Sequence, residues 1–340
     1  MGTGAHAAVT PERIMQMAWG YAPPLMMEAA VRHGYFDLLD GGAKTAGEVA
    51  AQSGTSLRGA RAILNALAGL QLLSKDAQGR FTLAADTAQF LVSTKPGYFG
   101  GLVRNLSRSI MGQWSKLAEI AKRGGPETGV NQQETGTEFF HELVEAIFPL
   151  SYPAAAGLAR SLDVAAAQTT VNVLDLAAGS GVWGIALAHA SPHVRFTAVD
   201  WPGVLDVTAR VAARHGVADR LTCLAGDLLD VDFGSGFQIA TLGHILHSEG
   251  EPRSRKLLGK VFHALAPGGV IAIQEFLVNE ERTGPPMGLI FAVNMLVATE
   301  NGDTFSFEEI SGWLREAGFE NCRLQDSPGP SPLILATKPK

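Results

Sequence analysis

A glycine-rich segment at residues 177–184 is the first feature of the chain that could do chemistry. It follows an apolar run and precedes a helical pattern, so it predicts a loop between a strand and a helix. In such a loop, backbone N–H groups at the helix N-terminus point at a ligand. Gly179, Gly181 and Gly184 spell G-x-G-x-x-G, and Asp200 follows 19 residues after Gly181. Taken alone, this pattern favours a nicotinamide dinucleotide and a dehydrogenase.

Three carboxylates at or near predicted strand ends favour a different ligand. Asp175 lies just before the glycines, where it would repel a pyrophosphate but attract an ammonium group. Asp200 ends the next strand and Asp227 follows the third, which suits a ribose and the edge of a base. S-adenosylmethionine carries an ammonium, a ribose, an adenine and a positive sulfonium. The acids therefore favour this cofactor, and the dehydrogenase is kept as an alternative.

Two histidines follow the strand predicted at residues 239–242. His244 and His247 lie at the carboxyl edge, where open α/β sheets bind ligands. A histidine in this position is suited to take a proton from a hydroxyl acceptor during methyl transfer. The H-x-x-H spacing also raises the question of a metal. The sequence offers no convincing third ligand, so no metal is predicted.

These segments in combination resemble the class I methyltransferases, specifically the O-methyltransferases related to plant caffeate and animal acetylserotonin enzymes. The resemblance rests on residues 173–181, 199–202, 226–227 and 245–247, in that order along the chain. It covers nearly the whole sequence, because those enzymes also begin with a winged-helix dimerisation domain. It implies S-adenosylmethionine as cofactor, a small-molecule acceptor and a homodimer formed through the N-terminal domain.

The resemblance also implies roles for single residues. Asp175 and Gly179 would lie by the methionine moiety, Asp200 on the ribose, and Asp227 at the adenine. His247 matches the family's catalytic base, and Glu275 matches the acid that orients it. The implied cofactor contacts are Asp175, Ala177, Gly179, Gly181, Asp200, Trp201, Gly226, Asp227 and Leu228.

An apolar segment at residues 288–299 has helical spacing. It could be a core helix, and in the family it lines a pocket for an apolar, aromatic acceptor. The implied acceptor contacts are His244, Phe291, Asn294 and Met295.

Two departures from the family pattern bear on the chemistry. Thr304 stands where plant enzymes have a second acid, with Asp303 and Glu300 as possible substitutes. Gly243 stands where the family has a lysine, four residues before the base. N- and C-methyltransferases of the same fold therefore stay open as alternatives to O-methylation.

The surrounding elements divide the chain into three predicted parts. Residues 1–97 have the order helix, helix, hairpin of a winged-helix domain, with the hairpin at 72–83. Residues 98–165 form a helical connector that contributes to the substrate cleft. Residues 166–340 alternate strands and helices, which predicts a Rossmann-like α/β sheet, mainly parallel with an antiparallel last strand. The predicted strands are 170–176, 195–199, 221–225, 239–242, 270–274, 322–326 and 333–337.

Charge and composition exclude several other classes. Residues 1–165 carry 14 Lys and Arg against 14 Asp and Glu, and residues 166–340 carry 13 against 19. A winged helix that binds DNA needs a basic excess, so the DNA-binding alternative is disfavoured and no nucleic-acid partner is expected. The sequence has two cysteines and no apolar run of the length that a membrane span needs. We expect a cytoplasmic enzyme without a membrane partner.

Overall fold

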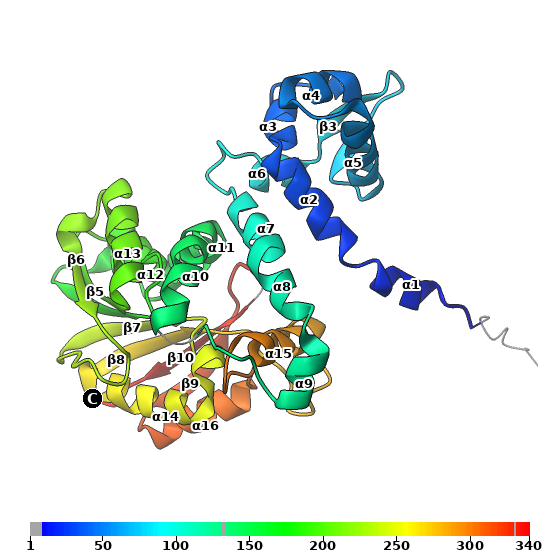
Figure 1. Cartoon of the computed structure of the whole chain (residues 1–340). Coiled ribbons are helices and arrows are strands. Elements are labelled where there is room, and N and C mark those ends of the chain that lie inside the picture. The colour runs from blue at the N-terminus through cyan, green and yellow to red at the C-terminus, as the bar shows by residue number, and fades with distance from the viewer. Residues whose placement is uncertain (1–8, 131–132, 330) are drawn as a thin grey trace, which may run out of the picture. The chain divides into compact units, whose positions relative to one another are not determined.

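The computed structural model describes residues 9–130, 133–329 and 331–340. It forms two compact units, Met1–Ile110 and Met111–Lys340 (Figure 1). The elements of the first unit are α1 (Glu12–Ala18), α2 (Ala22–Arg32), α3 (Tyr35–Asp40), β1 (Lys44–Thr45), α4 (Ala46–Ser53), α5 (Leu57–Gly69), β2 (Leu73–Lys75), β3 (Arg80–Leu83), α6 (Ala85–Phe90), α7 (Gly100–Asn105) and the π-helix Leu106–Ile110.

The first unit contains the predicted helices and hairpin, with one strand more than expected. The hairpin strands β2 and β3 pair antiparallel, and the short strand β1 adds to β3, giving the order β1-β3-β2. Helix α5 begins after Ser56, whose hydroxyl accepts a hydrogen bond from Gly59 N. Its apolar face buries Leu64 and Leu67 against Phe81 of β3.

The first helical stretch of the chain is broken into α1 and α2. Pro23 and Pro24 lie in the first turn of α2. A proline has no backbone N–H, so a helix cannot run through them without losing hydrogen bonds, whereas the first turn tolerates them.

The second unit is built on a seven-stranded sheet. Its strands are β4 (Val171–Leu176), β5 (Val194–Asp200), β6 (Leu221–Ala225), β7 (Phe237–Gly243), β8 (Leu265–Gln274), β9 (Glu320–Gln325) and β10 (Leu333–Thr337). Their order is β6-β5-β4-β7-β8-β10-β9. The first five run parallel, and β10 is antiparallel to both of its neighbours. This confirms the predicted fold class.

Helices cover both faces of this sheet (Figure 1). They are α8 (Met111–Trp114), α9 (Leu117–Arg123), α10 (Gln133–Ala146), α11 (Phe148–Ser161), α12 (Val182–Ala190), α13 (Pro202–Arg214), α14 (Leu246–Ala264), α15 (Pro286–Ala298) and α16 (Phe307–Glu316), with short 3₁₀ turns at Val164–Ala166 and Ala218–Arg220. Helix α16 begins with a capping box, in which Ser306 and Glu309 bond each other's backbone N–H.

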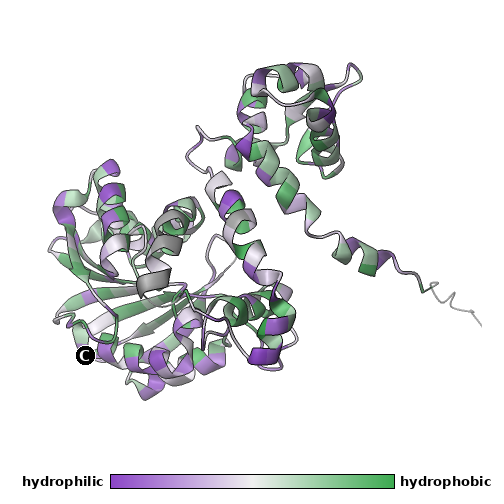
Figure 2. Ribbon diagram, viewed as in Figure 1, coloured by the Kyte–Doolittle hydropathy of each residue, from purple (hydrophilic) through white to green (hydrophobic). Residues whose placement is uncertain are grey.

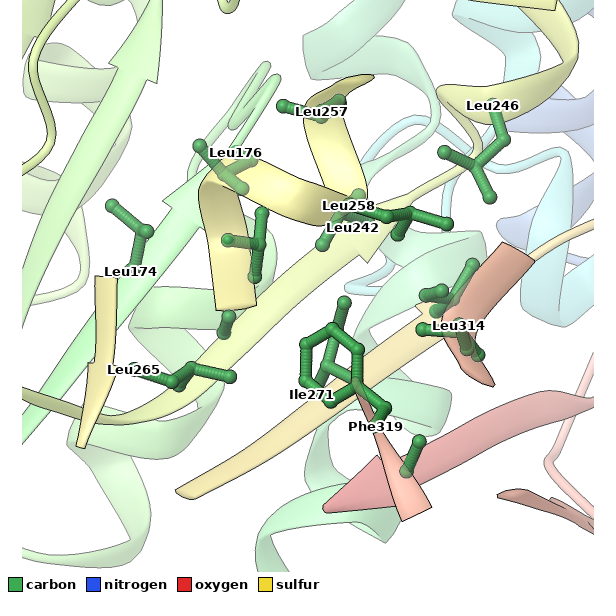
Figure 3. Packing of buried hydrophobic residues seen from close by; sticks show 14 of the residues in the cluster. Leu174, Leu176, Leu242, Leu246, Leu257, Leu258, Leu265, Ile271, Leu314 and Phe319 are labelled. Carbon is green, nitrogen blue, oxygen red and sulfur yellow. The ribbon is translucent and has the colours of Figure 1, made fainter. Parts of the chain in front are cut away.

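Alternating side chains of the strands fill two separate cores. Leu174 and Leu176 of β4 pack toward α14 and α16, whereas Val173 packs toward α12 and α13. Figure 3 shows Leu174 and Leu176 in the first core, together with other members of the cluster that include Leu257 of α14 and Leu314 of α16. Figure 2 shows hydrophobic residues along the strands and hydrophilic residues on the outer turns of α14 and α16. The order in which the parallel strands are added reverses between β4 and β7, so the carboxyl ends of these strands form the expected ligand edge.

Gly184 in α12 is required by the packing of α12 on β5. A Cβ at Gly184 would lie 2.2 Å from Cδ2 of Phe196, a ring that is 1% exposed. We expect Gly184→Ala to lower the free energy of unfolding by about 1–3 kcal/mol, the usual cost of overpacking.

Denaturant unfolding measures this effect, with Gly259→Ala as the matched control. Gly259 also lies in a helix, but a Cβ there meets nothing within 4 Å. The control should gain roughly 0.5–1 kcal/mol, because alanine is the better helix former. Equal stability of the two variants would contradict the packing argument.

Two negative findings hold for the part of the chain that the structure describes. Among residues 9–130, 133–329 and 331–340, no helix has the length and apolar character to cross a membrane. Within the same ranges, no group of three His, Cys, Asp or Glu side chains could hold a metal ion.

Candidate active site

The glycine loop lies between β4 and α12, as its sequence predicts. Ala177, Gly179 and Gly181 all have positive φ, at 48°, 56° and 73°. A Cβ at Gly181 would lie 2.8 Å from Cγ2 of Thr208, and the Thr208 hydroxyl donates to Gly179 O over 2.6 Å. The loop is therefore held in one shape, with no side chain at either glycine.

The side chain of Asp175 connects β4 to the start of α12 and to β7. Its side chain is fully buried, and it accepts hydrogen bonds from Gly184 N at 3.0 Å and from the Thr241 hydroxyl at 2.7 Å. Burial raises the pKa of Asp175 to about 7, against the lowering effect of both hydrogen bonds. Both of its oxygens are thus bonded to the protein. A contact with the methionine moiety stays a prediction.

Asp200 fixes the end of β5 to the same loop. One oxygen accepts from Gly179 N at 2.9 Å and the other from Trp201 N at 2.7 Å. Burial raises the pKa of Asp200 to about 6, and the two backbone hydrogen bonds oppose this rise. Asp200 and Gly179 are therefore brought together by the fold, at adjacent strands β5 and β4.

Asp227 lies just beyond β6, which is the next strand in the sheet. Gly226 precedes it with φ 147°, and a Cβ there would collide with Val231 at 2.4 Å. The Asp227 carboxylate accepts from Leu229 N at 2.8 Å, which shapes the turn, and from Arg253. Asp175, Asp200 and Asp227 thus follow the sheet order β4, β5, β6.

His247 and Glu275 form a buried pair at the ends of β7 and β8. Nδ1 of His247 lies 2.6 Å from Oε2 of Glu275, whose other oxygen accepts from Leu246 N at 2.7 Å and His247 N at 3.3 Å. A carboxylate only accepts, so Nδ1 carries a proton, and in the neutral ring Nε2 then has a free lone pair. Burial alone would raise the pKa of Glu275, but the charge and hydrogen bonds of His247 lower it. In this arrangement Nε2 of His247 can accept a proton.

Two phenylalanine rings lie beside His247. The rings of Phe291 and His247 are edge-to-face, with centroids 4.9 Å apart, and the centroid of Phe276 lies 4.2 Å from that of Phe291. His244 adopts positive φ (58°), and its Nε2 lies 3.1 Å from the Ser331 hydroxyl. Burial lowers the pKa of His244 to about 4, so its ring is neutral at physiological pH.

Comparison with known proteins identifies the family. Residues 156–320 match the O-methyltransferase domain, and residues 15–94 match the O-methyltransferase dimerisation domain. The chain is 30% identical to a Streptomyces sahachiroi 3-hydroxy-5-methyl-1-naphthoate 3-O-methyltransferase, covering 96% of this chain and 95% of the relative. The chain belongs to the O-methyltransferase family. Its cofactor is S-adenosylmethionine.

Two further relatives agree with this family. The tetracenomycin polyketide synthesis 8-O-methyl transferase of Streptomyces glaucescens is 26% identical over 97% of both chains. The crystal structure of a Nostoc punctiforme protein superposes on this chain with a TM-score of 0.89 at 27% sequence identity. The match covers 98% of this chain and 100% of the Nostoc punctiforme chain.

The ligand edge of this O-methyltransferase fits its cofactor. Glycine is needed at both loop positions, because a Cβ at Gly179 would meet Val144 and a Cβ at Gly181 would meet Thr208. It leads into the N-terminus of α12, and Asp200 and Asp227 follow on successive strands. Nothing in these donors and acceptors conflicts with a ligand that carries an amine, a ribose and an adenine.

Two of the predicted acceptor contacts are engaged within the protein. Met295 is 5% exposed, and the Asn294 carbonyl oxygen accepts from the indole N–H of Trp114 at 2.9 Å. Phe291, one turn before both, is the residue that touches His247. Trp114 was missed because its partner lies 180 residues away, beyond any local sequence pattern.

The two departures from the family pattern have structural explanations. Thr304 is fully buried and donates to Gly288 O at 3.2 Å, so it fills a packing role. Asp303 contacts His247 through the backbone, donating its N–H to His247 O at 2.9 Å. A side chain at Gly243 would collide with the Trp183 indole at 2.2 Å. Substitution of the second acid by Asp303 or Glu300 stays a prediction.

The buried carboxyl of Asp175 predicts a pH effect on stability. Because its pKa rises from 3.8 to about 7 on folding, the stabilising contribution is complete below pH 3.8 and is lost as the pH rises through 7. In Asp175→Asn, the amide oxygen can accept from Gly184 and the amide NH₂ can donate to Thr241. The wild type should lose about 1.4 kcal/mol per pH unit relative to this variant between pH 4 and 7.

Denaturant unfolding of both proteins at a series of pH values, without cofactor, measures the difference. If the free energy of unfolding depends on pH in the same way for wild type and Asp175→Asn, the buried carboxyl does not titrate in this range.

Proposed function

We propose that this O-methyltransferase methylates a hydroxyl group on a small aromatic or polyketide-like acceptor, with His247 as the general base. The observation that carries the proposal is the buried His247–Glu275 pair, which leaves Nε2 free among the rings of Phe291 and Phe276. The names of the relatives support the acceptor class, since one acts on a hydroxynaphthoate and another in tetracenomycin polyketide synthesis.

When bound, S-adenosylmethionine supplies an electrophilic methyl group on a sulfonium. The protein then has to align the acceptor oxygen with this methyl and remove the hydroxyl proton. His247 takes the proton at Nε2, and the Glu275 carboxylate stabilises the resulting imidazolium through Nδ1–H. Aromatic side chains exclude water and hold the acceptor ring by stacking.

Cofactor contacts from the glycine loop and the following strands belong to the same proposal. Asp200 would accept from the ribose hydroxyls, and Asp227 from the adenine amino group. Ala177, Gly179, Gly181, Trp201, Gly226 and Leu228 would line the rest of the site. The order β4, β5, β6 supports this assignment, because it matches the order of the methionine, ribose and adenine moieties.

The direct test of the cofactor class is calorimetric titration of the protein with S-adenosylmethionine and with NAD. We expect binding of S-adenosylmethionine only. Binding of NAD alone would favour the dehydrogenase and overturn the proposal.

We further propose that residues 1–97 form a winged-helix-like dimerisation domain, that residues 98–165 connect it to the methyltransferase domain at 166–340, and that two copies form a homodimer. Apolar side chains of the first helices support the dimer, because Ile14, Met17 and Trp19 are 73%, 67% and 60% exposed. Light scattering should give twice 35.9 kDa. A monomer mass would contradict the homodimer.

Helix α5 offers only Arg58 and Arg61 as cations, so we propose no nucleic-acid partner. An electrophoretic shift of duplex DNA at low salt would overturn this part of the proposal.

A further inference from the structure

The carboxylate of Asp227 is held by Arg253 of α14. One terminal nitrogen of the guanidinium donates to both oxygens of Asp227, at 2.9 Å to Oδ1 and 2.8 Å to Oδ2. Leu229 N also donates to Oδ1, at 2.8 Å. A carboxylate has about four lone-pair sites, and three are used here. The site that remains belongs to Oδ2 of Asp227.

The same guanidinium joins two parts of α14. Its Nε donates to Oε2 of Glu249 at 2.5 Å, and Glu249 is 8% exposed. Gly250 lies between them with non-helical angles, φ 70° and ψ 168°, so the helix is broken at this residue. The first turn, which carries His247, is therefore linked to the rest of α14 by the Arg253–Glu249 pair.

A second cation on the same face of α14 holds the rest of the loop after β6. Lys260 lies seven residues after Arg253, so the two side chains lie on one face of the helix, two turns apart. Its ammonium donates to the carbonyl oxygens of Leu228, Leu229 and Val231 at 2.9, 2.6 and 2.8 Å. The loop that begins at Asp227 is thus positioned by α14 at both ends.

We propose that Arg253 is a positioning residue for the adenine end of the cofactor, and that it selects a 6-amino over a 6-oxo purine through Asp227. This inference rests on the proposed function. The hydrogen bonds from Arg253 and Leu229 N fix the orientation of the Asp227 carboxylate, and a carboxylate can only accept. The free site on Oδ2 therefore suits the exocyclic amino group of adenine and disfavours the oxygen of hypoxanthine.

Calorimetry with two probes, S-adenosylhomocysteine and S-inosylhomocysteine, tests this inference. Wild type should bind the adenosyl compound at least about tenfold more tightly. Arg253→Met keeps an unbranched side chain but leaves Asp227 and Glu249 without their common counter-ion. It should bind the adenosyl compound about tenfold more weakly and lose most of the preference. Arg253→Lys should restore part of both.

A double-mutant cycle with Asp227→Asn separates positioning from a general loss of structure. The amide of this variant can turn either its oxygen or its NH₂ toward the base, so it should also lose the preference. If Arg253 acts through Asp227, adding Arg253→Met to Asp227→Asn should change the preference no further. Asp227→Asn alone keeps this test open if Arg253→Met does not fold.

Three results would overturn the inference. The first is an unchanged preference in folded Arg253→Met, and the second is an unchanged preference in Asp227→Asn. The third is an additive loss in the double variant. If neither probe binds to the wild type, the result is a different one, because it overturns the proposed function itself.

Discussion

Replacing His247 with alanine should lower the turnover number by about 10²–10⁴-fold, the usual contribution of a positioned base. Cofactor affinity should stay near that of the wild type, because His247 bonds to Glu275 and touches Phe291, whereas the glycine loop lies at β4. Turnover with a saturating acceptor and calorimetry with S-adenosylhomocysteine measure the two quantities separately. His263→Ala is the matched control, since this histidine is exposed near the other end of α14.

Glu275→Gln sharpens the same prediction. The backbone N–H groups of Leu246 and His247 both donate to Oε1 of Glu275, so the amide oxygen of glutamine must occupy that place. Its NH₂ group then faces Nδ1 of His247 and forces the ring proton onto Nε2. A neutral ring in this tautomer cannot accept a proton at Nε2. Turnover should fall nearly as far as in His247→Ala; wild-type turnover in either variant would remove the pair from the mechanism.

Replacing Asp200 with alanine should weaken binding of S-adenosylmethionine by about 100-fold or more. The change removes the proposed acceptor for the ribose hydroxyls, and hydrogen bonds to a charged group contribute about 1.5–3 kcal/mol each. It also leaves Gly179 N and Trp201 N without their side-chain partner, so the glycine loop loses one of its hydrogen bonds to the end of β5.

Calorimetry measures this loss, with Asp206→Ala as the control. Asp206 lies on α13, close in sequence, but its side chain is exposed. An unchanged affinity in Asp200→Ala would count against the ribose role, and an equal loss in both variants would point to a general effect of charge.

The strands and the order of the motifs were accessible from the sequence because both depend on local patterns. Strands β6 and β10 were predicted at their observed bounds, and β4, β5, β7 and β9 within a few residues. Strand β8 begins at Leu265 rather than at residue 270. Its first residues include Pro267, Gly268 and Gly269, which have the composition of a turn.

The long-range hydrogen bonds that position the site residues could not be predicted from the sequence. The bond between Trp114 and Asn294 joins residues 180 positions apart, and the bond between Asp175 and Thr241 joins residues 66 apart. Such pairs depend on how helices and strands pack, which local periodicity does not encode. For the same reason Arg253 carried no signal, since a single arginine on a polar helix face is typical of solvated surface.

The most direct test of the central claim uses S-adenosylmethionine with a ¹³C-labelled methyl group and a panel of aromatic acceptors that carry hydroxyl groups, hydroxynaphthoates included. Carbon NMR of the product distinguishes a methoxy carbon from methyl on nitrogen or on carbon. The account predicts a labelled methoxy group, formed at least about 10²-fold more slowly by His247→Ala. Label on nitrogen or carbon, or an equal rate in the variant, would contradict it.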